Sequence, residues 1–219
     1  MLELDNVGLV CLSTIYIEQS IYAIEHSCSN IRFNNVKFFT NRTIKSDIFD
    51  CIEIPNMLSI MDYNNFVLYN LGKYITSKYI LIVQWDGFVI NPNMWDPMFL
   101  NYDYIGARWI NNVCGNGGFS LRSKKLYDAI DDNRDVFSRN VSYDIPRFNE
   151  ENVTNNEDVV ICYHNRKFLE SFGIKFCNND LCDKFSVESR PYNNSFGFHG
   201  FGITSNLPDI ALKNKNNRG

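Results

Sequence analysis

Five consecutive apolar residues, Tyr79–Val83, are the segment that most limits the folds open to this chain. A run of this length without a polar interruption is typical of a parallel strand that is covered on both faces. A second, nearly continuous apolar run at residues 7–14 predicts another such strand, and a helical pattern follows at residues 15–26. Strand and helix patterns continue to alternate along the first half of the chain. This order predicts an α/β sheet with right-handed crossovers.

Shorter segments complete the expected fold. Asp62 is the expected N-cap of an amphipathic helix, and Ser123 is the expected N-cap of another. We therefore predict a single α/β domain at residues 1–205, with a mixed, mainly parallel central sheet flanked by helices, followed by a flexible C-terminal tail at residues 206–219. Besides the two apolar runs, the expected strands are residues 36–40, 51–54 and 104–106.

The second half of the chain is more polar. Residues 131–156 are irregular in composition and are predicted to form a mobile loop. Residues 157–172 show a helical pattern, with Asn155 or Asn156 as the expected N-cap. Gly173 is the expected residue just beyond the end of this helix.

Charge, length and cysteine content argue against several classes of protein. The 219 residues have a formal net charge of −4, which argues against nucleic-acid binding. No stretch approaches the ~20 apolar residues of a membrane span, so that membrane contact is expected to be peripheral or through a partner. The seven cysteines are odd in number and include no CxxC pair, which predicts neither a disulfide framework nor a structural zinc site. Reduced thiols and a cytoplasmic location are expected.

The first candidate site, Gln84-Trp85-Asp86, directly follows the strongest predicted strand. Ligands of open α/β sheets bind at the carboxyl ends of the strands. A carboxylate at this position can bind a hard divalent cation, which in turn neutralises a diphosphate. The alternative is that Asp86 is only a turn residue.

The second candidate segment, Gly115-Asn116-Gly117-Gly118, precedes a short apolar segment. Adjacent glycines let a backbone approach a ligand closely, and they also form ordinary turns. Taken alone, this segment is better explained as a flexible turn.

An acidic pair, Glu157-Asp158, opens the last long helical pattern. The helix dipole favours acidic residues at a helix N-terminus, and this alone accounts for them. In a catalytic site such a carboxylate acts as a general base that takes a proton from a hydroxyl group. The helix dipole would lower its basicity, whereas burial or nearby negative charge would raise it.

Of the three histidines, His199 has the most unusual surroundings, because it lies in an aromatic and glycine-rich segment, Phe196 to Phe201. Imidazole is a good ligand for ions such as Mn²⁺. A single histidine is also a common structural residue. His26 and His164 fall within helical patterns, where packing or surface roles explain them.

The order of these four motifs resembles that of the GT-A glycosyltransferases, especially the inverting β-1,3-galactosyltransferase and fringe group. Those enzymes have a metal-binding DxD after a strand, a Gly-Gly segment before a short strand, a Glu-Asp-Val motif that bears the base, and a late histidine that completes the metal site. The Trp-Asp-Gly-Phe and Phe-Gly-Phe-His-Gly segments are also similar to those of uncharacterised bacterial and viral proteins regarded as glycosyltransferases. The resemblance extends over residues 7–203 in outline and implies a GT-A-like fold.

The resemblance implies a role for each motif. Asp86 matches the last Asp of DxD, with Gln84 where the first Asp would be, and His199 matches the late metal ligand. Asp158 matches the base, with Glu157 beside it as a further catalytic candidate. The implied cofactor is Mn²⁺, or else Mg²⁺. The implied donor- or nucleotide-binding residues are Thr14, Arg42, Gln84, Trp85, Asp86, Gly117 and Gly118.

The implied activity is metal-dependent transfer of a hexosyl group from a nucleotide sugar, with a UDP-sugar favoured, to a hydroxyl group of a glycan, with inversion. The loop at residues 131–156 is then expected to close over the acceptor. One alternative is a sugar nucleotidyltransferase, although such enzymes normally have a basic, Gly-rich loop after the first strand and this chain has neither Gly nor Lys at residues 12–16. The other is a non-catalytic carbohydrate-binding protein, which the 17 Phe, the 12 Tyr and the presence of Gln84 would fit.

Overall fold

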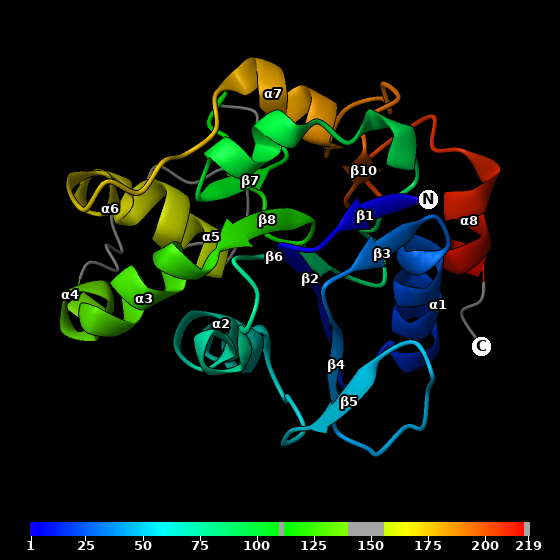
Figure 1. The fold of residues 1–219 in the computed structure, drawn as a ribbon, viewed down its shortest axis with the longest axis horizontal. Helices are drawn as coiled ribbons and strands as arrows, with labels where there is room; N and C mark the ends of the chain where they lie inside the picture. Colours follow the sequence, from blue (N-terminus) through cyan, green and yellow to red (C-terminus); the bar gives the residue numbers. More distant parts are fainter. Residues whose placement is uncertain (110–111, 140–155, 217–219) are drawn as a thin grey trace.

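The structure, a computed structural model, describes residues 1–109, 112–139 and 156–216. At its centre is a sheet of six strands, β2 (Val7–Leu12), β4 (Val36–Thr40), β5 (Asp50–Glu53), β6 (Tyr79–Val83), β7 (Tyr104–Gly106) and β8 (Ser120–Ser123), shown in Figure 1. The strand order is β5-β4-β2-β6-β8-β7. β5, β4, β2 and β6 run parallel, while β8 lies antiparallel to its neighbours β6 and β7. The predicted mixed, mainly parallel sheet is confirmed.

The central strands of the sheet are buried on both faces, which explains the uninterrupted apolar runs. In β6, Leu81 and Val83 point into one core, whereas Ile80 and Ile82 point into another. The side chains of a strand alternate between its two faces, so a strand covered on both sides is apolar at every position. All residues of β6 and of β2 are buried accordingly.

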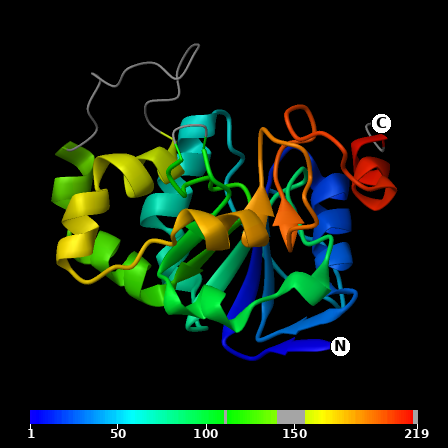
Figure 2. The ribbon, with the colours of Figure 1, turned by 90° about the horizontal axis from the view of Figure 1, so that it is seen from above.

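Helices from distant parts of the chain cover the two faces. α1 (Ile17–Cys28) and α8 (Asp209–Asn216) pack together on one face. α2 (Ile60–Tyr69), the 3₁₀-helix η1 (Leu71–Tyr74) and α3 (Lys124–Asp132) contribute to the core on the opposite face. Figure 2 shows the sheet enclosed between these two groups of helices. Among the described residues, no helix has the length and apolar character needed to cross a membrane.

The N-cap of α2 differs from the expected residue. The hydroxyl of Ser59 accepts a hydrogen bond from the backbone N–H of Asp62, and the Asp62 carboxylate accepts one from the N–H of Ser59. Asp62 is therefore the third helical residue of a capping box, and Ser59 is the N-cap. Both residue types cap helices well, so their identity alone did not distinguish them. The expected N-cap of α3 is confirmed, because the Ser123 hydroxyl accepts the N–H of Leu126 at 3.0 Å.

The helix expected at residues 157–172 is interrupted. Both the backbone N–H and the side-chain amide of Asn165 donate to the carbonyl of Val160, at 3.1 and 3.0 Å. This five-residue spacing opens a wider, π-helical turn in place of a regular one. The segment therefore divides into α5 (Glu157–Val159), the π-helical turn η5 (Val160–His164) and α6 (Arg166–Ser171).

The ends of this helical segment match the expectation in part. Gly173 follows its end with a φ of +74°, as expected of a glycine just beyond a helix. Asn156 precedes α5, but its side chain makes no capping hydrogen bond. Of the expected loop at residues 131–156, residues 134–139 form helix α4 (Arg134–Arg139), and residues 140–155 lie outside the described part of the chain.

The segment expected to be a flexible tail contains α8. Ala211 and Asn214 of this helix are fully buried. The Asn214 side chain donates to the carbonyls of Gln19 and Trp85, at 3.0 and 2.6 Å. Residues 209–216 are therefore packed against the domain. Their polar composition hid this, because the contacts that hold the helix are with residues far away in the sequence.

Two small parallel pairs of strands lie beside the main sheet. One joins β1 (Leu2–Leu4) to β3 (Ile31–Phe33). The other joins β9 (Ser186–Val187), which follows α7 (Asn179–Phe185), to β10 (Gly197–Phe198). The second pair places the residues that follow β9 next to those that follow β10. The remaining short elements are the 3₁₀-helices η2 (Pro92–Met94) and η3 (Pro97–Asn101).

The cysteines also differ from the expectation. Cys114 and Cys182 form a disulfide bond across 68 residues of sequence. The prediction of reduced thiols is therefore wrong for this pair, because the fold brings together cysteines that no local spacing connects. The cysteines that remain free are Cys11, Cys28, Cys51, Cys162 and Cys177.

Candidate active site

The candidate site lies at the edge of the sheet where the parallel strands end. β2, β4 and β6 run in the same direction and finish at this edge. β8 runs in the opposite direction and pairs Ser120 with Ile82, so it begins at the same edge. The topology thus brings residues 84–86 next to Gly117 and Gly118. Ligands of open α/β sheets bind at this position.

Asp86 lies at the tip of a tight turn. The backbone N–H of Gln84 donates to the carbonyl of Gly87 at 2.8 Å, and the reverse hydrogen bond is 3.1 Å long. The carbonyl of Asp86 accepts the N–H of Gly200 at 2.8 Å, which ties this turn to the segment that carries His199. Asp86 is thus a turn residue. The turn that contains it is held against the glycine-rich segment at Phe196 to Phe201.

The structure places His199 next to Asp86, as expected from the motif order. Nε2 of His199 lies 3.6 Å from Oδ1 of Asp86 and 3.1 Å from Oε1 of Gln84. Nδ1, the other ring nitrogen, lies 2.8 Å from Oε1 of Glu188. The imidazole is therefore held between one carboxylate at Nδ1 and two oxygen-bearing side chains at Nε2.

Glu188 is the residue of this site that the sequence did not reveal. It directly follows β9, and the pairing of β9 with β10 brings it to His199. Oε1 of Glu188 also accepts the side-chain amide of Asn116 at 2.7 Å. Nothing in the local sequence marks Glu188 as functional, because its neighbours in the site come from other segments.

The charge around His199 favours a cation at this position. Burial alone would lower the pKa of His199, but the hydrogen bond to Glu188 and the charges of Asp86, Glu188 and Asp158 outweigh it and raise this pKa to about 9. In the absence of another cation the imidazole itself thus holds a proton at neutral pH. The excess of carboxylates is the cause.

The donor set fits a divalent metal ion. Asp86 supplies a carboxylate oxygen, His199 an imidazole nitrogen and Gln84 an amide oxygen, all facing one another. This mixture of oxygen and nitrogen ligands suits Mn²⁺ better than Mg²⁺, which prefers oxygen alone. The bond from Nδ1 to Glu188 leaves Nε2 directed at Asp86, an arrangement common for histidine ligands.

The two adjacent glycines are explained by close packing. A Cβ atom on Gly118 would lie 2.1 Å from Nε2 of His199. A Cβ atom on Gly117 would lie 2.4 Å from Oε1 of Glu157 and 3.0 Å from Cβ of Asp158. The segment therefore passes between the histidine and the acidic pair with no room for a side chain. The segment does bend at these glycines, as the turn interpretation expected, but both are buried and closely packed.

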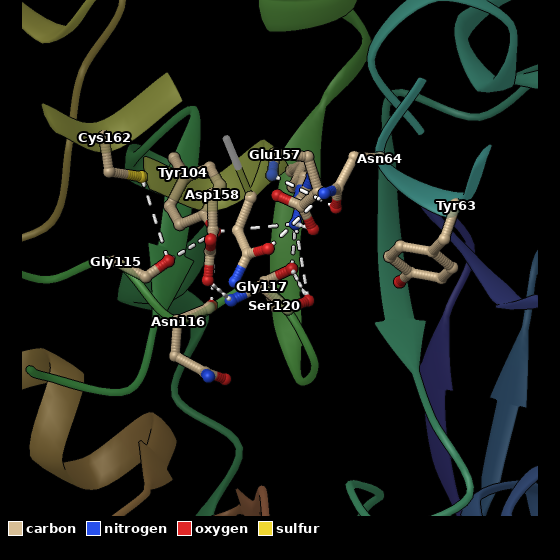
Figure 3. A network of polar contacts seen from close by, with 12 residues as sticks. Tyr63, Asn64, Tyr104, Gly115, Asn116, Gly117, Ser120, Glu157, Asp158 and Cys162 are labelled. Atoms are coloured by element: carbon tan, nitrogen blue, oxygen red, sulfur yellow. Dashed lines mark hydrogen bonds and ion pairs between the residues drawn. The ribbon is translucent and has the colours of Figure 1, made fainter. Parts of the chain in front are cut away.

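Asp158 is held in place by backbone groups and is partly buried. One carboxylate oxygen accepts the N–H of Gly117 at 2.9 Å, and the other accepts the N–H of Val159 at 2.8 Å. The first of these bonds crosses from α5 to the glycine segment, as Figure 3 shows. The Asp158 carboxylate is thus fixed in orientation on the opposite side of Gly117-Gly118 from His199.

The environment of Asp158 makes it more basic than a normal aspartate. Burial, followed by the negative charges of Glu157 and Glu188, raises the pKa of Asp158 to about 7. Arg122 and the hydrogen bond from Gly117 act in the opposite direction but are weaker. The helix dipole would lower the pKa of Asp158, but burial and the neighbouring carboxylates raise it by more.

Glu157 points away from the space between Asp158 and His199, into the interior. Its carboxylate forms an ion pair with Arg122 at 2.8 Å, and both side chains are almost completely buried. Arg122 also donates to the Ser120 hydroxyl at 2.9 Å and to the Gly117 carbonyl at 3.3 Å. This network, drawn in Figure 3, joins β8, the glycine segment and α5. The Glu157 carboxylate thus contacts Arg122 in the interior, next to the residue that carries the Asp158 carboxylate.

The remaining candidates lie at the same edge and already contact protein groups. The Thr14 hydroxyl accepts a backbone N–H from the segment before α2 at 3.2 Å. Arg42 forms an exposed ion pair with Glu18 at 2.9 Å. The Trp85 ring stacks on that of Tyr16, with centroids 4.4 Å apart. These residues lie after β2, β4 and β6, and the ends of β2 and β4 are separated from the start of β8 by β6.

Solved glycosyltransferase structures share this fold over nearly the whole chain. A glycosyltransferase involved in the glycosylation of the major capsid of PBCV-1 is similar with a TM-score of 0.55, at 12% identity, covering 96% of this chain and 97% of that one. An active-site mutant of LgtC is similar with a TM-score of 0.56, at 11% identity, covering 95% of each chain. The expected GT-A-like fold is confirmed by these likenesses.

Sequence comparison gives the family. No curated protein matches the chain. The model of one family, described as "Protein of unknown function (DUF5672)", matches residues 48–199, which is more than half of the chain. The matched range includes Asp86, Gly118, Asp158, Glu188 and His199, but not Thr14 or Arg42. The chain belongs to the DUF5672 family.

Proposed function

We propose that this protein is a metal-dependent glycosyltransferase that moves a hexosyl group from a nucleotide sugar to a hydroxyl group of a glycan, with inversion of the anomeric centre. The convergence of Asp86, His199 and Asp158 on the two sides of the Gly117-Gly118 segment carries the proposal. The likeness of the fold to those of solved glycosyltransferases supports it.

Asp86 and His199 are the proposed ligands of a divalent cation, Mn²⁺ or else Mg²⁺, with Gln84 close enough to take part. When bound, the cation would neutralise the negative charge that develops on the leaving diphosphate. The protein contributes orientation, because Glu188 holds Nδ1 of His199 and so keeps Nε2 directed at Asp86.

The nucleotide is proposed to lie along the ends of β2 and β4, where Thr14, Arg42 and Trp85 are found. Arg42 is exposed and can exchange its ion pair with Glu18 for a phosphate at small cost, since exposed ion pairs contribute only about 0–1 kcal/mol. A UDP-sugar is the favoured donor. This placement puts the diphosphate near Asp86 and the sugar near Gly117 and Gly118.

Asp158 is the proposed general base. The acceptor oxygen forms a bond to the anomeric carbon while the bond from that carbon to the diphosphate oxygen breaks, and the electron pair leaves with the diphosphate. Asp158 takes the proton of the acceptor hydroxyl. Its pKa of about 7 suits this role at neutral pH, and its two hydrogen bonds from Gly117 and Val159 fix its direction.

The test combines binding and turnover. Wild-type protein is titrated by calorimetry with a panel of nucleotide sugars, with and without Mn²⁺, and release of nucleoside diphosphate is then measured with the donor that binds. Asp86→Ala should abolish metal-dependent binding, whereas Glu25→Ala, which removes an exposed carboxylate on α1, should not. Unchanged affinity in Asp86→Ala contradicts the metal assignment.

The same experiment separates the two alternatives. A sugar nucleotidyltransferase would form a nucleotide sugar and pyrophosphate from a nucleoside triphosphate and a sugar phosphate. A carbohydrate-binding protein would bind ligand without releasing nucleoside diphosphate at any metal concentration. Inversion is tested by the anomeric configuration of the product, and a product that retains the configuration of the donor contradicts direct displacement.

A further inference from the structure

Three cysteines from three segments of the chain meet next to the glycine segment. The sulfur atoms of Cys114, Cys177 and Cys182 all lie within 4.8 Å of one another, and the three residues are buried. Cys114 and Cys182 form a disulfide bond, with Cα atoms 6.3 Å apart. Cys177 is a free thiol whose sulfur donates to the carbonyl of Asn178 at 3.2 Å.

Each of the three cysteines is anchored through its backbone. Cys114 pairs with Arg108 in a β-bridge. The N–H of Cys177 donates to the carbonyl of Tyr104 in β7 at 3.0 Å. Cys182 lies within α7. The fold itself therefore holds the three sulfur atoms together.

A structural disulfide bond between Cys114 and Cys182 does not explain why the sulfur of Cys177 lies beside it. A disulfide bond needs two cysteines, and a third buried thiol beside it adds nothing to that cross-link. Three thiolates at one point are, in contrast, a common ligand set for zinc. The absence of a CxxC pair in the sequence does not argue against such a site here, since each ligand comes from a different segment.

A pocket lies next to two of the three buried cysteines, Cys114 and Cys177. This pocket of about 620 Å³ is lined by Cys114, Cys177 and Asn178, together with Cys162 and His164. The pocket gives a metal ion a path to the sulfur atoms. It also has room for a water molecule as a further ligand.

We propose that the reduced protein binds one Zn²⁺ through the thiolates of Cys114, Cys177 and Cys182, with a solvent molecule from the pocket as the fourth ligand. The disulfide is then the oxidised, metal-free form of the same site. Reduction by a phosphine adds two electrons and two protons to the disulfide, and the phosphine becomes a phosphine oxide with its oxygen taken from water. Zinc then replaces the protons of the thiols.

The site has a structural consequence that is independent of the proposed function. Cys114 directly precedes residues 115–118, and α7, which carries Cys182, leads through β9 to Glu188. Either cross-link, zinc or disulfide, ties these two segments together. The same two segments supply Asn116 and Glu188, which are hydrogen-bonded to each other at 2.7 Å.

The experiment compares the oxidised protein with protein reduced by tris(2-carboxyethyl)phosphine. Both are titrated with Zn²⁺ by calorimetry and with Co²⁺ by absorption spectroscopy. A thiolate-to-cobalt charge-transfer band reports sulfur ligands only, so it separates this site from Asp86 and His199. The reduced protein should bind one Zn²⁺ per chain more than the oxidised protein and show the band, and the oxidised protein should show no band.

Two matched variants test the ligand set. Cys177→Ser should lose the additional Zn²⁺ that reduction brings and weaken the charge-transfer band, while Cys162→Ser, which changes a cysteine of the same pocket outside the cluster, should keep both. Cys177→Ser retains both disulfide cysteines, so its folding is checked by circular dichroism in the oxidised state before reduction. Absence of the band in reduced wild type overturns the proposal. So does an unchanged band in Cys177→Ser, or an equal loss in both variants.

Discussion

Gly118 and His199 are packed so closely that a Cβ atom on Gly118 would lie 2.1 Å from Nε2 of the imidazole. Gly87 stands against the same ring, where a Cβ atom would lie 2.8 Å from Cδ2 of His199. Two glycines from different segments, one after β6 and one before β8, thus shape the space that the histidine occupies. Nε2, the ring nitrogen next to Gly118, is also the nitrogen that lies 3.6 Å from Oδ1 of Asp86.

The first prediction follows from this contact. Gly118→Ala should force the His199 ring away from Asp86 and so lower the affinity for Mn²⁺, as measured by calorimetry or by the electron paramagnetic resonance of free Mn²⁺. Gly202→Ala is the control, because a Cβ atom there meets nothing within 4 Å. Wild-type Mn²⁺ affinity in Gly118→Ala, with the fold intact, would show that His199 takes no part in binding.

The second prediction concerns the buried ion pair of Arg122 and Glu157. Arg122→Met leaves the Glu157 carboxylate buried without its cation, which should lower the free energy of unfolding by about 3–5 kcal/mol. Oε2 of Glu157 has no hydrogen-bond partner among the described residues, so little else compensates this charge. Chemical denaturation measures the loss.

Two further variants control this measurement. Arg32→Met makes the same substitution in an exposed ion pair with Glu3 and should change the stability far less, because water already screens that pair. The double variant Arg122→Met/Glu157→Leu removes both charges and should recover part of the stability lost in Arg122→Met. A loss in Arg122→Met as small as that in Arg32→Met would contradict the burial of this pair.

The third prediction concerns the base. Asp158→Asn keeps the size of the side chain but cannot accept the proton, so it should bind donor and metal normally and transfer sugar about 10²–10⁴-fold more slowly. In the wild type, kcat/KM should rise with pH through an apparent pKa near 7, because only the ionised carboxylate of Asp158 acts as a base. Near-normal turnover in Asp158→Asn would remove it from this role.

The carboxyl group of Asp158 also makes the free energy of unfolding depend on pH, in a direction that its raised pKa determines. Folding raises the pKa of Asp158 from 3.8 to about 7, so its favourable contribution is complete below pH 3.8 and is lost as the pH rises to about 7. Asp158→Asn, which cannot ionise, should therefore be more stable relative to wild type at pH 8 than at pH 4. Equal differences at the two pH values would mean that the pKa is not raised.

The fourth prediction concerns Glu188. Its substitution should weaken metal binding through His199, by about 10–100-fold, as is typical when the hydrogen-bond partner of a histidine ligand is removed. Glu188→Gln retains an oxygen that can accept from Nδ1, so its effect should be smaller than that of Glu188→Ala. Mn²⁺ titration of both variants measures this order, and equal affinities in wild type and Glu188→Ala would refute the positioning role.

The sequence by itself determined the elements whose formation depends on local pattern. The continuous apolar runs of β2 and β6 required strands buried on both faces, and Ser123 marked the start of α3 because its hydroxyl reaches the N–H of Leu126 within one turn. The prediction that Asp86, Gly118, Asp158 and His199 share a site came from the resemblance of their order to that of the GT-A glycosyltransferase motifs.

Only the tertiary structure decided the features that depend on contacts between distant segments. Glu188 joins the site because β9 pairs with β10, the two glycines are required because His199 and Glu157 press on them, and α8 is ordered because Asn214 reaches Gln19 and Trp85. Cys114, Cys177 and Cys182 meet for the same reason. The energies of such contacts arise from burial and hydrogen bonding between residues that no sequence spacing links, so no local pattern contains them.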